Sequence, residues 1–297
     1  MSTRVSVVLP TYNRAADVER ALRSVLAQTF TDWEVLVVDN HSTDSTSDVV
    51  ASFRDARIRL LEVRNEGVVA RSRNLGIHAA TGEFVALLDS DDWWAPHKLA
   101  ASVSALERGA DVVYHDLYLV HHAAQQFFWR RARTRQLSKP VHDDLVRRGN
   151  ALTNSSVVLR RSLFLDIGGI SEDRALIAFE DYDAWLRIAR ITDRFTRLDR
   201  ALGYYWKGGA NLSTPERTLR NLEHFVATHF TGEEWRDGKL PGWVDYAYGR
   251  AYYHLRSPDR SRTYSRRALY GQIGWRKRVK AILTLAALSL GGGRPTP

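Results

Sequence analysis

Three carboxylates stand within four residues at the end of an apolar run, in the segment Leu87-Leu88-Asp89-Ser90-Asp91-Asp92. Neighbouring carboxylates repel one another unless a cation lies between them, and carboxylate oxygens are preferred ligands of Mg²⁺ and Mn²⁺. We therefore expect this acidic cluster to hold one of these two metals. The alternative is an acidic turn that caps a helix beginning near Pro96. For one aspartate that simpler interpretation would be preferred, but three together favour a metal.

Two further apolar runs also end at polar residues. Val5 to Leu9 leads into Pro10-Thr11-Tyr12-Asn13, and Glu34 to Val38 leads into Asp39-Asn40. Tyr12 offers an aromatic face to a nucleobase, and Asp39 offers an acceptor for a base N–H. Together with a metal that neutralises a diphosphate, these groups suit a nucleoside diphosphate with something transferable attached. The sequence has no GxxxxGK[ST] motif and no GxGxxG after the first run, which argues against a P-loop NTPase and a dehydrogenase.

Strands and helices in a regular order must position these residues. Strands are predicted at 5–9, 34–38, 58–63 and 84–88, with helices between them that include an apolar stripe along 18–26 and a segment at 67–80. A strand, a helix and a strand in about 35 residues form a βαβ unit with parallel strands. The predicted fold is α/β, with a mostly parallel sheet flanked by helices. Ligands bind at the carboxyl ends of such strands, where Tyr12, Asp39 and the acidic cluster share one edge.

Five segments in order resemble the family 2 glycosyltransferases with the GT-A fold. They are Val5 to Arg14, Val38 to Asp44, Ala70 to Gly76, Leu88 to Asp92, and Phe179 to Leu186. The resemblance covers roughly residues 4 to 213. It implies a Rossmann-like catalytic domain of the GT-A type, and an enzyme that moves a sugar from a nucleoside-diphosphate sugar to an acceptor hydroxyl.

The resemblance also implies roles for single residues. Pro10, Thr11 and Tyr12 form the wall against the nucleobase, and Asp39 bonds the base edge. Contacts to the nucleotide, its ribose and the bridging metal are implied for Arg73, Asp91 and Asp92. Asp181 is the implied catalytic base, with Glu180 beside it on the acceptor side.

Asp181 would take the proton from the attacking hydroxyl, which is general-base catalysis worth typically 10²–10⁴-fold. Attack opposite the leaving group inverts the anomeric carbon, as the family resemblance also implies. A structural alternative exists, because acids in the first turn of a helix complement its dipole without any catalytic purpose. Ser155 and Lys207 are weaker candidates for contacts to phosphate or acceptor. Ser155 also fits a polar turn before a strand, and Lys207 stands where the family often carries Arg or His in the run Tyr204 to Ser213.

Composition agrees with a folded enzyme. The chain has 297 residues, of which 44% are hydrophobic and 26% charged, enough for one large core and a smaller appendage. It has no cysteine, which excludes a disulfide framework and a thiolate zinc site. Because the first residues lead directly into a strand and no apolar run reaches about 20 residues, we expect neither a signal peptide nor a membrane span. The expected location is the cytoplasm.

The positive charge is concentrated near the C-terminus. Residues 256–280 carry nine Lys or Arg against one acid, Asp259, and the apolar stretch Ala281 to Leu290 follows. Such a segment is typical of a peripheral anchor on an anionic membrane, here over 256–290 at the inner face of the cell membrane. The alternative is an ordinary packed helix with a solvated basic face. We predict a catalytic domain at 1–214, with a nucleotide-binding half at about 1–115 and an acceptor-side half at about 116–214, and a helical region at 215–297.

Other classes of protein fit less well. A nucleic-acid-binding protein would account for the calculated pI of 9.9, but the charge lies in one tail rather than along a groove. A sugar nucleotidyltransferase normally shows a Gly-rich basic loop where this chain has Pro10-Thr11-Tyr12-Asn13. We expect no nucleic-acid partner, a UDP-sugar donor by family habit, and a glycan or lipid-linked acceptor in bacterial surface glycan or glycolipid assembly. The arginines of 130–135 are candidates for contact with an anionic acceptor such as a lipid diphosphate.

Overall fold

The computed structural model describes residues 3–122, 124–125, 127–208, 214–235 and 239–289. The chain forms two compact units. The first comprises residues 1–141, 151–172 and 187–210, and the second comprises 142–150, 173–186 and 211–297. The domain boundary predicted at 214 stays a prediction.

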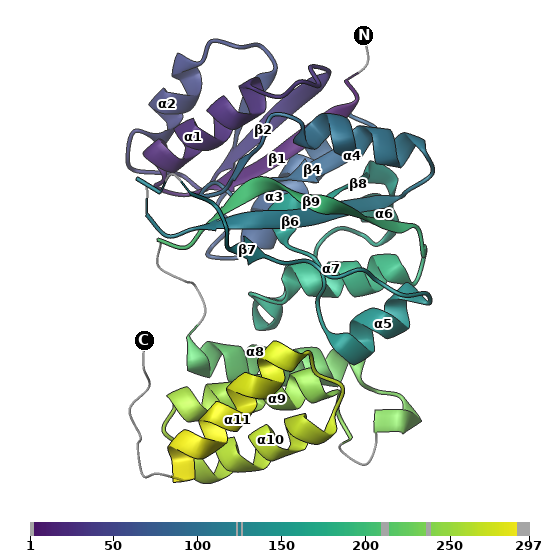
Figure 1. Ribbon diagram of the computed structural model, residues 1–297. Helices are drawn as coiled ribbons and strands as arrows, with labels where there is room; N and C mark the ends of the chain where they lie inside the picture. The colour runs from purple at the N-terminus through teal and green to yellow at the C-terminus, as the bar shows by residue number, and fades with distance from the viewer. Residues whose placement is uncertain (1–2, 123, 126, 209–213, 236–238, 290–297) are drawn as a thin grey trace. The chain divides into compact units, whose positions relative to one another are not determined.

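The first unit is built on one mixed sheet with the strand order β3-β2-β1-β4-β8-β6-β9-β5 (Figure 1). Its N-terminal half is parallel: β3, β2, β1 and β4 run side by side in the same direction. The other half is mixed, because β8 is antiparallel to both β4 and β6 while β9 is parallel to β6. The bounds of the strands are β1 Val5–Thr11, β2 Trp33–Asp39, β3 Ile58–Glu62, β4 Phe84–Leu87, β5 Trp93–Trp94, β6 Val112–Val120, β7 Arg131–Ala132, β8 Val158–Arg160 and β9 Phe195–Trp206.

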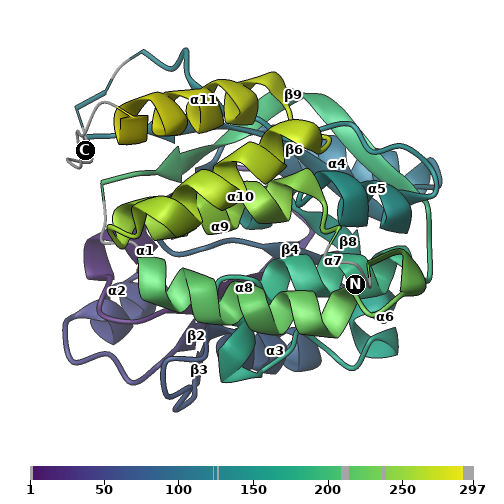
Figure 2. The ribbon, with the colours of Figure 1, turned by 90° about the horizontal axis from the view of Figure 1, so that it is seen from below.

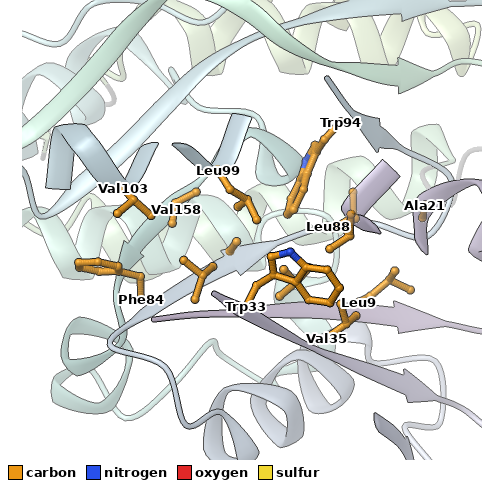
Figure 3. Close-up of a cluster of buried hydrophobic side chains, with 14 of the residues drawn as sticks. Leu9, Ala21, Trp33, Val35, Phe84, Leu88, Trp94, Leu99, Val103 and Val158 are labelled. Atoms are coloured by element: carbon orange, nitrogen blue, oxygen red, sulfur yellow. The ribbon is translucent and has the colours of Figure 1, made fainter. Parts of the chain in front are cut away.

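Helices cover both faces of the parallel half. Helix α1 (Ala15–Leu26) and helix α4 (Lys98–Glu107) pack with odd-numbered strand residues such as Val7 and Val35. Figure 3 shows this core, with Leu9, Val35, Phe84 and Leu88 from the sheet beside Ala21, Leu99 and Val103 from the helices. Helix α3 (Val69–Ala79) lies on the opposite face, where Gly76 meets Val8 and Val38. The remaining helices between the described strands are α2 (Thr46–Ser52), α5 (Val141–Arg148), α6 (Arg161–Asp166) and α7 (Glu180–Ala189).

The parallel sheet therefore has the predicted arrangement. Each predicted strand at 5–9, 34–38, 58–63 and 84–88 is present, and the helix predicted at 67–80 is α3. Strands β2, β1 and β4 are neighbours and run parallel, so their carboxyl ends meet at one edge of the sheet. The prediction that Tyr12, Asp39 and the acidic cluster share this edge is confirmed.

The second unit is helical. It contains α8 (Pro215–His229), α9 (Gly242–His254), α10 (Pro258–Tyr270) and α11 (Trp275–Ser289), and α10 packs against both α9 and α11 (Figure 2). Helix α8 begins as the sequence implies, with the Thr214 side chain accepting from the Arg217 N–H and Pro215 in the first turn. Within the described residues, no helix combines the length and the apolar character that a membrane crossing requires.

Candidate active site

The ends of β1 and β2 are joined by a network of hydrogen bonds. Thr11 and Asp39 are paired in the register of the two strands, and the Asp39 side chain is buried. The Ser42 backbone N–H donates to Asp39 Oδ2 at 2.9 Å, and the Ser42 hydroxyl donates to Oδ1. Asn13, at a φ of 50°, donates its N–H to Ser42 Oγ at 2.8 Å. The carboxylate of Asp39 thus fixes the loop after β2 against the loop after β1.

Tyr12 lies between these fixed residues but faces solvent. Its side chain is 53% exposed, whereas the neighbouring Thr11 is buried. An aromatic ring held on a rigid loop and open to solvent is a stacking surface for a planar ligand. This arrangement agrees with the predicted nucleobase wall at Pro10, Thr11 and Tyr12, which stays a prediction, as does the base contact of Asp39.

The first aspartate of the acidic cluster is held from three sides. The Asp89 N–H donates to Ser155 Oγ at 3.1 Å. Asp89 Oδ1 accepts from Arg73 Nη2 at 2.8 Å and from Asn154 Nδ2 at 3.0 Å. Arg73, the predicted nucleotide contact, is nearly buried, and its guanidinium pairs with Asp89. Its contact with a nucleotide stays a prediction.

Asp91 is the more open of the two predicted metal ligands. Its side chain is 32% exposed, and Arg14 Nη1 lies 3.5 Å from its Oδ2. Its backbone oxygen accepts from Arg20 Nη2 at 2.9 Å, and the Arg20 guanidinium stacks 4.4 Å from the Trp93 ring. Burial and the charge of Asp89 raise the pKa of the Asp91 carboxyl, although Arg14 opposes the shift.

Asp92, in contrast, is 1% exposed. The backbone N–H of Trp206 donates to its Oδ1 at 2.9 Å. Burial, followed by the charge of Asp89, holds the pKa of Asp92 well above its ordinary value, and the Ser155 hydroxyl only partly offsets this. Burial is the first cause of both pKa shifts and the charge of Asp89 is the second, so a cation placed beside these two carboxylates would favour their charged forms.

The residues of this cluster fit a metal that is shared with a phosphate ligand. In the described part of the chain, no three His, Cys, Asp or Glu side chains converge in the way that an all-protein metal site requires. Mg²⁺ usually keeps several waters and binds through one or two carboxylates together with substrate phosphates. The partly exposed carboxylate of Asp91 and the adjacent buried carboxylate of Asp92, whose Oδ2 has no hydrogen-bond partner among the described residues, meet that lesser requirement.

Ser155 and Lys207 occupy different environments. Ser155 is fully buried in a short 3₁₀ turn, Asn154–Ser156, and its carbonyl accepts from Trp94 Nε1 at 2.8 Å. Ser155 therefore holds the acidic loop in place through its hydrogen bond with the Asp89 backbone. Lys207 is exposed, and its Nζ lies 5.3 Å from the centre of the Tyr205 ring. Their contacts to phosphate or acceptor stay predictions, and residues 209–213 of the run around Lys207 lie outside the described residues.

The second unit carries the predicted catalytic base at the start of α7. Tyr182 is buried, with its hydroxyl donating to the Leu145 carbonyl at 2.6 Å and its ring stacked on Phe225. Asp183 is also buried, and its Oδ1 lies 3.0 Å from His229 Nε2. Glu180 is 8% exposed, and Asp181 is more accessible than either of these two acids. The Asp183 carboxylate is therefore part of the packing between α7 and α8, while the roles of Asp181 as base and of Glu180 beside it stay predictions.

Several residues of this site were not identified from the sequence. Asp89 belongs to the recognised motif but had no assigned role, and Arg14 follows directly after Asn13 in the first motif. Their positions in the motifs were the available signal. No local sequence pattern indicates the contacts that the acidic loop makes with Arg20, Asn154 and the backbone of Trp206, because these residues lie in distant parts of the chain.

Comparison with solved structures supports the predicted fold. The chain is similar to Staphylococcus aureus TarS 1–349 in complex with UDP-GlcNAc, with a TM-score of 0.62 and 19% identity, covering 99% of this chain and 93% of that one. It is also similar to the mannosyltransferase PcManGT of Pyrobaculum calidifontis in complex with GDP-Man and Mn²⁺, with a TM-score of 0.58 and 23% identity over 98% and 87% of the two chains. The predicted GT-A-like fold with C-terminal helices is confirmed.

Sequence relatives match part of the chain. The Escherichia coli protein UDP-Glc:alpha-D-GlcNAc-diphosphoundecaprenol beta-1,3-glucosyltransferase WfgD is 40% identical over 102 residues, which cover 34% of this chain and 40% of that protein. The chain spans less than half the length of the first curated relatives it matches. The family model described as glycosyl transferase family 2 matches residues 6–167, more than half of the chain. This match includes the strand ends, the acidic loop and Ser155, and the chain belongs to glycosyltransferase family 2.

Proposed function

We propose that the chain is a metal-dependent, inverting glycosyltransferase that moves a sugar from a nucleoside-diphosphate sugar to an acceptor hydroxyl. The observation that carries this proposal is one edge of the parallel sheet, where an exposed Tyr12 ring lies on the same rim as the three carboxylates of Asp89, Asp91 and Asp92. A ring that stacks a base and acids that attract a metal–diphosphate together describe a nucleotide-sugar site.

The donor proposed is a UDP-sugar. TarS has been solved with UDP-GlcNAc, and WfgD is named for UDP-Glc, whereas PcManGT has been solved with GDP-Man and Mn²⁺. These names support a nucleoside diphosphate with Mn²⁺ or Mg²⁺, and they favour uridine as the base. Asp91 and Asp92 are the proposed residues at the metal.

The chemistry proposed is a single displacement. Asp181 accepts the proton of an acceptor hydroxyl while that oxygen forms a bond to the anomeric carbon. The bond from the anomeric carbon to the diphosphate breaks on the opposite face, and its electron pair leaves with the diphosphate. A metal bound at the acidic cluster would stabilise the charge of that leaving group. Glu180 is proposed to shape the acceptor side.

The acceptor proposed is a lipid-linked or glycan hydroxyl at the inner face of the cell membrane. A hollow of about 460 Å³ opens after Val120 at the end of β6, lined by His121, Trp129 and Arg130 among others. Val120, at the end of the same strand, pairs with Trp206, whose N–H donates to Asp92. Exposed arginines at 130, 131 and 133 suit an anionic acceptor such as a lipid diphosphate. The acceptor in the name of WfgD, a GlcNAc-diphosphoundecaprenol, belongs to that chemical class.

A turnover assay tests the proposal. We expect the chain with Mn²⁺ to release nucleoside diphosphate from one of UDP-Glc, UDP-GlcNAc or GDP-Man when a sugar-diphosphate lipid is added. Asp181→Asn should lower kcat by about 10²–10⁴-fold and leave nucleotide affinity unchanged, since a general base acts only in the transition state. Asp199→Asn, whose side chain is 92% exposed, is the matched control and should keep the wild-type rate.

The outcomes separate two levels of the proposal. Transfer by Asp181→Asn at the wild-type rate would show that the base is a different residue. Absence of donor turnover by the wild-type protein with every donor and acceptor would contradict the transfer function itself.

Replacing Arg130, Arg131 and Arg133 together by Ser should raise the acceptor KM and leave the donor KM unchanged.

A further inference from the structure

Helix α11 presents apolar side chains to solvent along one line. Trp275 is 70% exposed, Val279 46%, Ile282 51% and Leu283 61%. Their spacing of four, seven and eight residues places them on a single face of the helix. We call these four residues the α11 stripe. A helix that only packs on its own domain turns such a stripe inward.

The opposite face of α11 is the one that packs. Ala281 is 1% exposed and Thr284 4%, and these side chains lie against the helices that α11 contacts, α9 and α10. The C-terminal end of α11 is also attached to α10, because Arg262 Nη2 donates to the Leu288 carbonyl at 2.7 Å. Figure 2 shows α11 alongside α10. The α11 stripe is therefore held outward by the packing of small residues on the other side.

Cations flank the stripe on both sides. At 100° per residue, Arg276 and Lys280 lie along one flank and Arg278 along the other, and all three are exposed. The Arg276 guanidinium stacks 5.3 Å from the Trp275 ring. Helix α11 contains no acid to neutralise them. Long cationic side chains beside an outward apolar stripe can reach headgroup phosphates while the stripe enters the acyl boundary.

We propose that the α11 stripe and its flanking cations form a docking surface for an anionic lipid bilayer, with α11 lying in the plane of the interface. Charge complementarity selects this occupant. Residues 256–280 carry nine cations against one acid, so a second copy of the chain would bring like charges together, whereas anionic headgroups neutralise them. Tyr270, 94% exposed at the end of α10, adds a second aromatic side chain of the kind that favours membrane interfaces. Leu290, the last residue of the predicted segment 256–290, lies outside the described residues.

The proposal is independent of the transfer chemistry and is tested with the full chain and vesicles alone. We expect co-sedimentation with phosphatidylcholine vesicles that contain phosphatidylglycerol, little binding to pure phosphatidylcholine vesicles, and weaker binding as salt rises. The double variant Ile282→Asp with Leu283→Asp should lower the partition coefficient at least about tenfold, because it places charges at the boundary of the acyl region. Replacing Arg276, Arg278 and Lys280 by Ser should lower it about fivefold per cation on strongly anionic vesicles.

Matched controls separate a specific surface from general basicity. Ile191 is 50% exposed in the first unit, so Ile191→Asp repeats the same chemical change at the same exposure and should bind vesicles like the wild type. The proposal would be overturned if the α11 double variant bound anionic vesicles as strongly as the wild type does. It would also be overturned if the wild type did not bind anionic vesicles. A dimer in analytical ultracentrifugation that the double variant converts to a monomer, without vesicle binding, would overturn it in favour of self-association.

Discussion

Lys98 is a fully buried amine close to the acidic loop of the first unit. Its Nζ lies 3.5 Å from the centre of the Trp94 ring and has no hydrogen-bond partner among the described residues. Burial holds the pKa of Lys98 well below its ordinary value, and burial together with Lys98 lowers the pKa of the nearby His115 to about 3. His115 is therefore neutral near pH 7, and burial disfavours the charged form of Lys98. Trp94 in turn donates to the carbonyl of Ser155, which supports Asp89.

Replacing Lys98 by Met should stabilise the protein in a pH-dependent way. Below pH 10 the unfolded chain binds a proton at Lys98 that the folded protein does not, so the stability of the wild type falls as the pH falls. The stability difference in favour of Lys98→Met should grow as the pH falls below about 10, by at most about 1.4 kcal/mol for each pH unit, until the folded protein binds the same proton. Urea unfolding at several pH values measures it. The exposed Lys207→Met should give a difference that does not change with pH, and the same flat result for Lys98→Met would show that its amine is charged in the folded state.

Residue types were predictable from the sequence, but the partners of those residues were not. The acids, the exposed aromatic ring and their shared edge follow from strand ends and spacing. That Ser42 occupies both oxygens of Asp39, and that Arg73 pairs with Asp89, follows from side-chain directions in a folded loop. Such pairings depend on geometry that hydrophobic periodicity does not carry.

At the scale of elements, the motif Arg73-Asn74-Leu75-Gly76 shows how α3 is attached to the sheet. Asn74 receives the Ile170 N–H at Oδ1 and donates through Nδ2 to the Ile170 carbonyl, at 2.9 and 2.8 Å. Gly76 lies so close to β1 that an added Cβ would stand 2.6 Å from Val8 Cγ1. A residue with a side chain at this position would push the helix away from the sheet. The motif thus positions Arg73 beside Asp89.

Gly76→Ala should accordingly destabilise the protein. Alanine gains about 1 kcal/mol of helix propensity, but overpacking against β-branched Val8 and Val38 costs about 1–3 kcal/mol. Because the added Cβ would stand only 2.6 Å from Val8 Cγ1, the cost lies in the upper half of that range, and we expect a net loss of about 1–2 kcal/mol in the free energy of unfolding and a Tm lower by a few degrees. Gly274, with no atom within 4 Å of an added Cβ, is the control, and its Ala variant should stay within about 0.5 kcal/mol of the wild type. A Gly76→Ala variant as stable as the wild type would contradict the close packing of α3.

The elements with local patterns were predictable, and those with distant partners were not. Strands β1 to β4 and helix α3 follow from the periodicity of apolar residues. The parallel pairing of β6 with β9, across which Val112 faces Phe195, joins segments that are more than 80 residues apart, and no local pattern reports it. The outward direction of the α11 stripe was likewise hidden, because the sequence shows an apolar face but not which face packs.

At the scale of the whole molecule, charge and chemistry are divided between different parts of the chain. The acidic cluster lies in the first unit, while the predicted base Asp181 and the basic helices α10 and α11 lie in the second. The family match covers residues 6–167 and therefore ends before Asp181 and before the basic helices. Family membership and geometry therefore support the nucleotide site, whereas the catalytic base and the membrane surface are proposals for the experiments described above.

Calorimetric binding of UDP, GDP, CDP and dTDP, each with Mn²⁺ and with EDTA, tests the nucleotide site most directly. We expect one of the four nucleotides, UDP before the others, to bind in the presence of Mn²⁺ and not to bind in the presence of EDTA. Asp91→Asn should weaken this binding about ten- to hundredfold, as expected for loss of a charged ligand, while Asp199→Asn leaves it unchanged. A metal–diphosphate site at the acidic cluster would be contradicted if the nucleotide affinity were the same with EDTA and in Asp91→Asn as in the wild type with Mn²⁺. It would also be contradicted if no nucleotide bound in the presence of Mn²⁺.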